Sequence, residues 1–241
     1  MAHITSQINF TTNMRYRVIA FTILLCSWKP LLAQYSGTLT VGGTSPNFKT
    51  VNEAFDSLES SGVNGPVVLR IRGGVYQEQV TVDQIPGADS TNSISVKPDK
   101  GNTIPVMIRH LTTSSQVAVV TVKQAHVHFD SITFKIDDKY SGSHFALALK
   151  LMDSASYNVF RYNKFIGVKS DSTTLNFVPL VQALRVADST GAYLHFESNL
   201  FRYGWICFQA QLFSATVTGV HELKLEKNKF DSFFGMGIDI N

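Results

Sequence analysis

Residues 37–82 read GTLTVGGTSPNFKTVNEAFDSLESSGVNGPVVLRIRGGVYQEQVTV, and the prediction of the fold rests on this stretch. Its pattern predicts a short strand, a helix, an apolar strand at Val67–Arg72, a glycine turn at Gly73 and Gly74, and another strand. No second helix is signalled after it, whereas a doubly wound fold needs helices that alternate with strands throughout. The sequence therefore predicts an all-β protein in which a single helix covers the first end.

The helix in this stretch has a recognisable start, face and end. Thr50 and Glu53 form a T-x-x-E capping box, in which each side chain binds a free backbone N–H group at the helix start. Such a cap contributes about 1 kcal/mol. Apolar residues then recur at i, i+3, i+4 and i+7, at Val51, Ala54, Phe55 and Leu58. Gly62 is placed to end the helix, so we expect a helix that buries one face.

The chain after this stretch is predicted to consist of strands separated by turns. The predicted strands are Ile94–Val96, Val106–Ile108, Val117–Val122, Val127–Phe129, Ile132–Ile136 and Ala146–Leu151. A repeat also aligns, with apolar residues three positions before and two positions after Asp130, Asn163, Asn199 and Asn228. The intervals are 33, 36 and 29 residues, and periods of this size are typical of solenoids.

Each column of the repeat has an expected physical role. Apolar residues in fixed register stack inward about 4.8 Å apart, and each buried Phe contributes roughly 1.5–3 kcal/mol. Asparagine tolerates the left-handed backbone of a sharp bend, and its amide both donates and accepts, so we expect an asparagine ladder between coils. We interpret the neighbouring outward column as a solvated salt-bridge ladder made of His128, Arg161, Glu197 and Glu226. His126 and His128 have a spacing that suits a metal, but no third ligand is identifiable, so no metal site is predicted.

Residues 47–58 (NFKTVNEAFDSL) and 67–82 (VVLRIRGGVYQEQVTV) resemble the opening of pectinesterases and related secreted proteins of the pectinesterase and pectate-lyase-like superfamily. That opening has an aromatic-x-T-[IV]-x-E-A helix, a strand and a G-x-Y-x-E turn. The stretch is also similar to a repeat domain of bacterial secreted proteins. The resemblance implies a right-handed parallel β-helix, which is a solenoid, with an N-terminal capping α-helix.

The catalytic motifs of pectinesterases do not continue in this chain. Where that family has a Gln that steadies the oxyanion, in Q-A-V-A-L, this sequence has Phe145 in FALAL. Residues Val168–Asp171 do not match the Q-D-T-L motif that supplies the acid. Residues Gly204–Phe208 stand nearest to D-F-I-F-G, whose Asp is the nucleophile, and they hold no carboxylate. Without an acid and a nucleophile the ester is not attacked, so we expect no demethylation of pectin.

Two classes of function stay open. The first is a non-catalytic surface module, either structural or carbohydrate-binding. The second is a polysaccharide lyase or hydrolase whose site lies partly outside this chain, and a lyase of this kind would use Ca²⁺ held by Asp or Glu. The candidate substrate-binding residues are acidic, aromatic or histidine side chains: Asp137, Asp138, His144, Asp171, Tyr203 and Trp205. The aspartates are better explained as ordinary solvated turn residues, and the aromatic residues are explained equally well by packing at the edge of a coil.

Residues 1–33 have the organisation of a signal peptide. Two arginines precede an apolar core at Val18–Cys26, and the Ala33–Gln34 bond suits cleavage. The apolar run is too short to span a bilayer as a stable helix. Met14 is an alternative start, and Cys26 is an alternative site of lipid attachment. We therefore expect a secreted or cell-surface protein.

Removal of the signal peptide leaves a mature domain, residues 34–241, without net charge. Residues 1–33 hold three of the 21 Lys and Arg residues and none of the 18 Asp and Glu residues, so the remainder is formally neutral. The composition therefore gives no electrostatic case for a nucleic-acid partner. Of the two cysteines only Cys207 remains, so we expect no disulfide bond within the domain.

The end of the sequence is expected to be incomplete or paired. Ile238 and Ile240 alternate with polar residues and predict a further strand after the last repeat. An uncovered last coil would present unpaired backbone groups, and repeat proteins need a polar cap at each end. We therefore expect further coils beyond Asn241, or another chain, to pair with this end.

Overall fold

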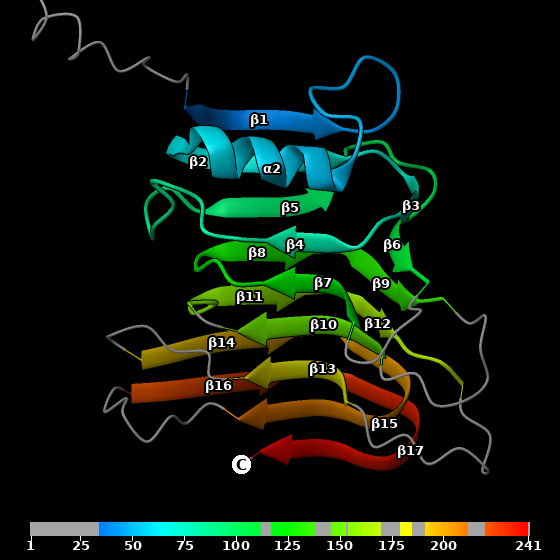
Figure 1. Ribbon diagram of the computed structural model, residues 1–241. Helices are drawn as coiled ribbons and strands as arrows, with labels where there is room; N and C mark the ends of the chain where they lie inside the picture. Colours follow the sequence, from blue (N-terminus) through cyan, green and yellow to red (C-terminus); the bar gives the residue numbers. More distant parts are fainter. Residues whose placement is uncertain are drawn as a thin grey trace, which may run out of the picture. The chain divides into compact units, whose positions relative to one another are not determined.

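The computed structural model describes residues 34–111, 117–137, 146–152, 154–169, 179–184, 191–211 and 220–240. Residues 34–241 form one compact unit, and within it the strands are stacked from β1 to β17 (Figure 1). Among the described residues, no helix is long and apolar enough to cross a membrane.

The first sheet in the described part of the chain has seven strands. In order across the sheet they are β1 (Tyr35–Val41), β2 (Val63–Ile71), β5 (Ile94–Pro98), β8 (Val127–Asp130), β11 (Asn158–Arg161), β14 (Gly191–Glu197) and β16 (Val220–Glu226). Every neighbouring pair is parallel. Parallel neighbours require the chain to return to the same side of the sheet before each new strand begins.

The second described sheet has ten strands in two runs. One run holds β3 (Gly74–Gln77), β6 (Val106–His110), β9 (Ile132–Ile136) and β12 (Lys164–Ile166). The other run holds β4 (Val80–Val82), β7 (Val117–Val122), β10 (Ala146–Met152) and β13 (Pro179–Leu184). The long strand β15 (Leu200–Gln211) pairs with both runs, and β17 (Lys229–Ile240) pairs with β15 along its length.

The chain visits the first sheet, then one run and then the other, in the same order on each turn. The register pairs Val67 with Ile94 and Asn158 with Leu194, so the turns differ in length, for example 27 and 36 residues. The structure is therefore an all-β parallel solenoid of about five turns. The six strands predicted between Ile94 and Leu151 are all present, as β5 to β10.

Helix α2 (Val51–Ser61) has the start, face and end that its sequence indicates. The Glu53 N–H donates to Thr50 Oγ1 at 3.0 Å, and Glu53 Oε2 accepts from the Lys49 N–H at 2.7 Å. Gly62 has a φ of 76°, and its N–H donates to the last turn of the helix at 2.7 Å. All four residues of the predicted apolar stripe are fully buried.

The expected position of the helix at the N-terminus is not confirmed, because strand β1 precedes α2 in the chain. The chain enters the solenoid as a strand because β1 pairs with β2 in the first sheet. The helix then packs against β4, which is an end strand of the second sheet. Its buried face joins the core, where the Phe55 ring centroid lies 6.5 Å from that of Phe129.

The G-x-Y-x-E turn holds the helix in place. The Glu78 carboxylate accepts from the backbone N–H groups of Val51 at 3.2 Å and Asn52 at 2.9 Å. Both belong to the first turn of the helix, where N–H groups have no partner within the helix. A Cβ at Gly42 would collide with the Tyr76 hydroxyl, so this turn also accounts for a glycine in the preceding loop. The motif is therefore explained by the fold and requires no chemical role.

Two columns of phenylalanine rings run through the core. The first sheet contributes a column with ring centroids 5.5 and 4.7 Å apart, made of Phe129, Phe160 and Phe196. The second sheet contributes a column with spacings of 5.3, 5.0 and 4.9 Å, made of Phe134, Phe165, Phe201 and Phe230. These spacings are close to the distance between neighbouring strands, so one ring is stacked for each coil.

Asparagine side chains join successive coils at one corner. Asn199 Oδ1 accepts from the Asn163 N–H at 2.9 Å, and Asn199 Nδ2 donates to the Phe160 carbonyl at 2.9 Å. Asn199 Nδ2 also lies 3.0 Å from Asn228 Oδ1. Asn163 and Asn228 make equivalent bonds to the backbone of the preceding coil. The predicted asparagine ladder is present.

Two details of the predicted repeat are wrong. The register pairs Lys164 with Thr133, so the residue opposite Asn163 is Ile132, and Asp130 lies two residues out of the column. The left-handed backbone belongs to the residue before each asparagine, with φ of 55°, 56° and 54° at Tyr162, Ser198 and Lys227. The preceding residue therefore makes the bend, and the asparagine satisfies the backbone groups that the bend leaves free.

Candidate functional site

The outer face of the first sheet carries a column of stacked rings. His126 precedes β8, Tyr157 precedes β11 and Tyr193 lies in β14, so each ring comes from a different coil. The centroids of His126 and Tyr157 are 4.9 Å apart with their planes at 5°, and those of Tyr157 and Tyr193 are 4.6 Å apart at 19°. The next residue in this column, directly opposite Tyr193, is Glu222 of β16.

A second outward column lies two residues further along each strand. It consists of His128, Val159, His195 and Lys224. Glu226, two residues beyond Lys224 on the same strand, binds two members of this column. Its Oε2 is 3.1 Å from His195 Nε2, and its Oε1 is 3.0 Å from Lys224 Nζ. The hydrogen bond from Lys224, followed by that with His195, lowers the pKa of the Glu226 carboxyl below its usual value.

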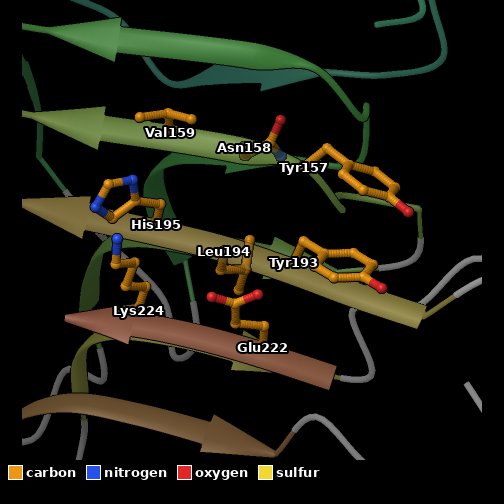
Figure 2. Close-up of a pocket in the computed structure, with 8 residues that line it drawn as sticks. All are labelled: Tyr157, Asn158, Val159, Tyr193, Leu194, His195, Glu222 and Lys224. Atoms are coloured by element: carbon orange, nitrogen blue, oxygen red, sulfur yellow. The ribbon is translucent and has the colours of Figure 1, made fainter. Parts of the chain in front are cut away.

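A groove of about 230 Å³ lies between these two columns, on β11, β14 and β16. Figure 2 shows the rings of Tyr157 and Tyr193 on one side, and His195 and Lys224 on the other. Glu222 lines the groove from β16. Strand backbone forms the floor, because the residues between the columns turn their side chains into the core. The groove therefore combines an aromatic wall with a polar one.

The expected salt-bridge ladder is present only in part among the described residues, in a third outward column where Arg161 and Glu197 pair and Glu226 stands opposite Glu197. Arg161 Nε lies 3.0 Å from Glu197 Oε2, and Lys227 Nζ lies 3.8 Å from Glu197 Oε1. The first member of the column is Asp130, because the register pairs Asp130 with Arg161. The prediction of His128 at that position is wrong, because the turn from β8 to β11 is two residues shorter than the aligned repeat suggested. Partly exposed pairs of this kind contribute under about 1 kcal/mol each.

Two of the predicted contact residues can be placed in full, and they lie apart. Asp137 follows β9, and its Oδ2 is 3.4 Å from Arg109 Nε of β6. Tyr203 lies in β15 with a φ of 59°, and its ring centroid is 5.8 Å from the guanidinium carbon of Arg202. Strand β12 separates β9 from β15, and both belong to the second sheet, whereas the groove is on the first. Three of the remaining candidates lie outside the described residues: Asp138, His144 and Asp171. For Trp205, the backbone is described and the side chain is not.

FALAL and Gly204–Phe208, the segments compared with the esterase motifs, lie at β10 and in β15. These strands and their neighbours carry an apolar column that alternates with their core-facing residues. In register across β7, β10, β13 and β15, this column is Val119, Ala148, Leu180 and Cys207, all buried. Burial raises the pKa of Cys207 to about 12, so its thiol stays protonated at neutral pH. The next column is polar, and Gln182 Nε2 donates to Gln209 Oε1 at 2.9 Å. These four strands contain no Asp or Glu that could act as acid or nucleophile.

Histidine and carboxylate side chains do not gather into a metal centre in the described ranges. No group of three His, Cys, Asp or Glu residues suited to a metal ion is found there. His126 stacks on Tyr157, and the His128 ring is half-buried in the second outward column, where burial lowers its pKa.

Comparison with known proteins finds solved structures of similar fold. No protein-family model and no curated protein matches the sequence. The pectin methyl esterase of rice weevil is 14% identical with a TM-score of 0.53, over 95% of this chain and 74% of that chain. The pectin methylesterase of Aspergillus niger is 19% identical with a TM-score of 0.51, over 82% and 68%. Pectin methylesterase PemA from Erwinia chrysanthemi is 16% identical with a TM-score of 0.45, over 74% and 55%, so this chain spans little more than half of its length.

The stacked sheets and the asparagine corners define a parallel β-helix protein. Within that class, the fold is similar to that of the rice weevil and Aspergillus pectin methylesterases, which are named for their action on pectin. The expected resemblance to this group of folds is therefore confirmed. Identities of 14% and 19% carry the fold and no catalytic residue.

The groove was not among the sites predicted from the sequence, although the sequence carries a signal for it. Tyr157, Tyr193 and Glu222 each stand six residues before one of the aligned asparagines. A common offset from a repeated residue predicts a common column in a solenoid. The column of His126 is harder to find, because the turn that contains it has no asparagine at the equivalent corner.

Proposed function

We propose that this protein is a polysaccharide-binding β-helix module, and that the groove on β11, β14 and β16 is its binding site. The observation that carries the proposal is the outward-facing pair Tyr157 and Tyr193, stacked at 4.6 Å along one wall of the groove. The similarity of the fold to two polysaccharide-processing enzymes supports a role of the same general kind.

The chemistry of the groove suits a sugar. A sugar ring presents C–H groups on its faces and hydroxyl groups at its edge, so it binds best where an aromatic surface adjoins polar groups. Tyrosine combines an apolar ring with a hydroxyl tip. Glu222 supplies hydrogen-bond acceptors, and Lys224 supplies donors for the hydroxyl groups. Apolar walls with a few converging polar groups are typical of ligand sites.

The backbone beneath the tyrosines is fixed by side chains from several coils. The Tyr193 N–H donates to Ser156 Oγ at 3.1 Å. Asn158 Oδ1 accepts from the Val127 N–H at 2.7 Å, and Asn158 Nδ2 donates to the Gln124 carbonyl at 2.9 Å. A groove built on tied strands does not have to be ordered when the ligand arrives, and this reduces the entropic cost of binding.

We further propose that the protein is exported and that α2 covers the first end of its solenoid. Export is supported by the signal-peptide pattern of residues 1–33, and the compact unit begins at the expected cleavage point, Gln34. The capping role is supported by the packing of α2 against β4, which pairs on its other side with β7. A mature N-terminus well upstream of Gln34, found by mass spectrometry, would contradict the first of these proposals.

A polysaccharide lyase or hydrolase is the second candidate. The observation in its favour is the fold, which two pectin methylesterases share. Against it, the strands nearest to the esterase motifs carry a buried apolar column and no carboxylate. A lyase would also need carboxylates free to hold Ca²⁺, whereas Asp137 lies beside Arg109. Binding without catalysis is therefore the better supported function.

Replacement of the groove tyrosines tests the binding site. Tyr157→Ala and Tyr193→Ala each remove part of the aromatic wall, so each should weaken binding by about tenfold or more, as for aromatic residues at other binding sites. The polysaccharide that wild-type protein retains is first found by affinity electrophoresis in gels that contain plant or microbial polysaccharides. Isothermal titration calorimetry with an oligosaccharide of that polymer then gives the affinities.

Tyr162→Ala is the matched control. Tyr162 is 58% exposed, lies outside the groove, and has a φ of 55°, almost the 56° of Tyr157. It should bind like the wild-type protein. If the groove variants bind as well as wild type, or if the control loses as much affinity as they do, the groove is not the binding site.

A further inference from the structure

Among the described residues, the carboxylate of Glu222 in the groove has no cationic partner. Two other polar side chains of the groove, His195 and Lys224, are both bound to Glu226. Glu222 is exposed, and in the described part of the chain no cation lies within ion-pairing distance of its carboxylate. A ligand that enters the groove therefore meets an unneutralised carboxylate.

Glu222 also stands where the column of rings ends. The register places it directly opposite Tyr193, and neighbouring strands lie about 4.8 Å apart. Within the described residues, the ring column has no member after Tyr193, so the Tyr193 face turned away from Tyr157 adjoins the strand that carries the carboxylate. A cationic amine in this position would contact an aromatic face and donate a charge-assisted hydrogen bond to the carboxylate.

We infer that the groove takes an amino sugar polymer, with a protonated amine bound between the Tyr193 ring and the Glu222 carboxylate. The inference rests on the proposed function and names its ligand class. A uronate chain such as pectate would bring further carboxylates next to Glu222, and like charges at this distance repel. Lys224 does not offset this repulsion, because its positive charge is already paired with the Glu226 carboxylate. The ligand therefore differs from the pectin for which the enzymes of similar fold are named.

Three oligosaccharides of equal length separate the ligand classes. A chitosan oligomer carries free amines, the fully N-acetylated oligomer has the same backbone without charge, and an oligogalacturonate carries carboxylates. Titration calorimetry is done with the mature chain at low salt and mildly acidic pH, where the amine is protonated. We expect the chitosan oligomer to bind about tenfold tighter than the acetylated one, and the oligogalacturonate to bind weakest. Added salt should reduce the first difference, because it screens the charge.

Two variants assign the preference to one carboxylate. Glu222→Gln keeps the shape of the side chain and removes its charge, so the preference for chitosan should disappear while the affinity for the acetylated oligomer stays the same. Asp56→Asn is the matched control, because Asp56 is an exposed residue of α2, outside the groove. It should leave all three affinities unchanged.

The outcomes separate the inference from the proposed function. If the acetylated oligomer or the oligogalacturonate binds tightest and Tyr193→Ala abolishes that binding, the ligand class is wrong and the binding function stands. If the preference for chitosan persists in Glu222→Gln, the amine does not bind at Glu222 and the inference is overturned. If neither these oligomers nor any polysaccharide of the electrophoretic screen binds, the proposed function fails as well.

Discussion

Asn199 shows how a single side chain completes the corner of the coil before its own. It is 1% exposed, and it binds both the N–H of Asn163 and the carbonyl of Phe160. Water has little access to either group. An unpaired buried polar group costs about 1–3 kcal/mol. Asn199 therefore stabilises the fold mainly by pairing these two backbone groups.

Asn199→Ala should therefore lower the free energy of unfolding by roughly 2–5 kcal/mol, since it leaves a donor and an acceptor without partners. Urea denaturation followed by circular dichroism measures the change. Asn64→Ala is the control, because Asn64 is an exposed residue of β2, and it should change stability by less than about 0.5 kcal/mol. Equal losses in the two variants would show that the ladder does not stabilise the fold.

His128 makes stability depend on pH. Burial lowers the pKa of His128 from its ordinary value of 6.5, and the charges of His126, Arg161 and Lys97 lower it further. In the unfolded chain the ring takes up a proton near its ordinary pKa, whereas in the native state it does so only at lower pH. As the pH falls below 6.5, the unfolded state binds more protons than the native state, so the free energy of unfolding decreases.

The variant His128→Gln should lose less stability than the wild-type protein between neutral and mildly acidic pH. The carboxyl groups of Glu226 and Asp231 have lowered pKa values, so their contribution is lost only at more acidic pH and does not obscure the comparison. Thermal unfolding at a series of pH values measures the difference. Parallel profiles for the two proteins would contradict the assignment to His128.

At the scale of elements, α2 depends on a residue that lies far from it in the chain. Glu78 binds the N–H groups of Val51 and Asn52, and Phe55 reaches the core beside Phe129. A helix of 11 residues is too short to be stable alone in water. Its stability must therefore come from this docking, and not from helix propensity.

Phe55→Ala should cost about 3–5 kcal/mol of unfolding free energy, because it removes a fully buried ring from the core. Asp56→Ala changes the neighbouring exposed residue and should have little effect on the unfolding midpoint in urea. A loss below about 1 kcal/mol for Phe55→Ala would mean that α2 is not docked.

The helix could be predicted in detail because its signals are local. The cap at Thr50, the apolar stripe and the stop at Gly62 all lie within a few turns of chain, and each was found where expected. Isolated strands such as Val117–Val122 could be predicted for the same reason. Strand β1 precedes α2, so the helix is not the first element of the chain. Its limits and its buried face are nevertheless those that the sequence predicts.

The register of the repeat was harder to predict, because it depends on the length of each turn. Asp130 resembles the aligned asparagines chemically, but the turn between β8 and β11 is two residues shorter than that alignment requires. The groove depends on register in the same way, since Tyr157 and Tyr193 meet only when 36 residues separate their coils. The side chains of the candidate site therefore follow from distances along the chain that no local motif specifies.

At the scale of the whole molecule, the same scaffold presents faces of different chemistry. The first sheet carries rings and charges on its outer side around the Tyr157 and Tyr193 groove. The second carries a buried apolar column that ends at Cys207. Beneath both faces the coils are held together in the same way, by a column of stacked phenylalanine rings from each sheet. Similarity of fold therefore identifies the scaffold alone. The side chains of the candidate site belong to the outer columns, which the scaffold does not determine.

The asparagine corners set a rule for how such a protein can change its length. Each asparagine serves the backbone of the preceding coil, so a deletion that runs from one asparagine to the next rejoins two equivalent corners. A deletion that removes a corner asparagine but keeps the coil that it serves leaves backbone groups of that coil unpaired. Between corners the turn lengths already vary, with 36 residues from Asn163 to Asn199 and 29 from Asn199 to Asn228, so loops there accept insertions. Gain or loss of whole coils is then the least disruptive change, and it would lengthen or shorten the outer surface of the solenoid by one strand of each sheet run at a time.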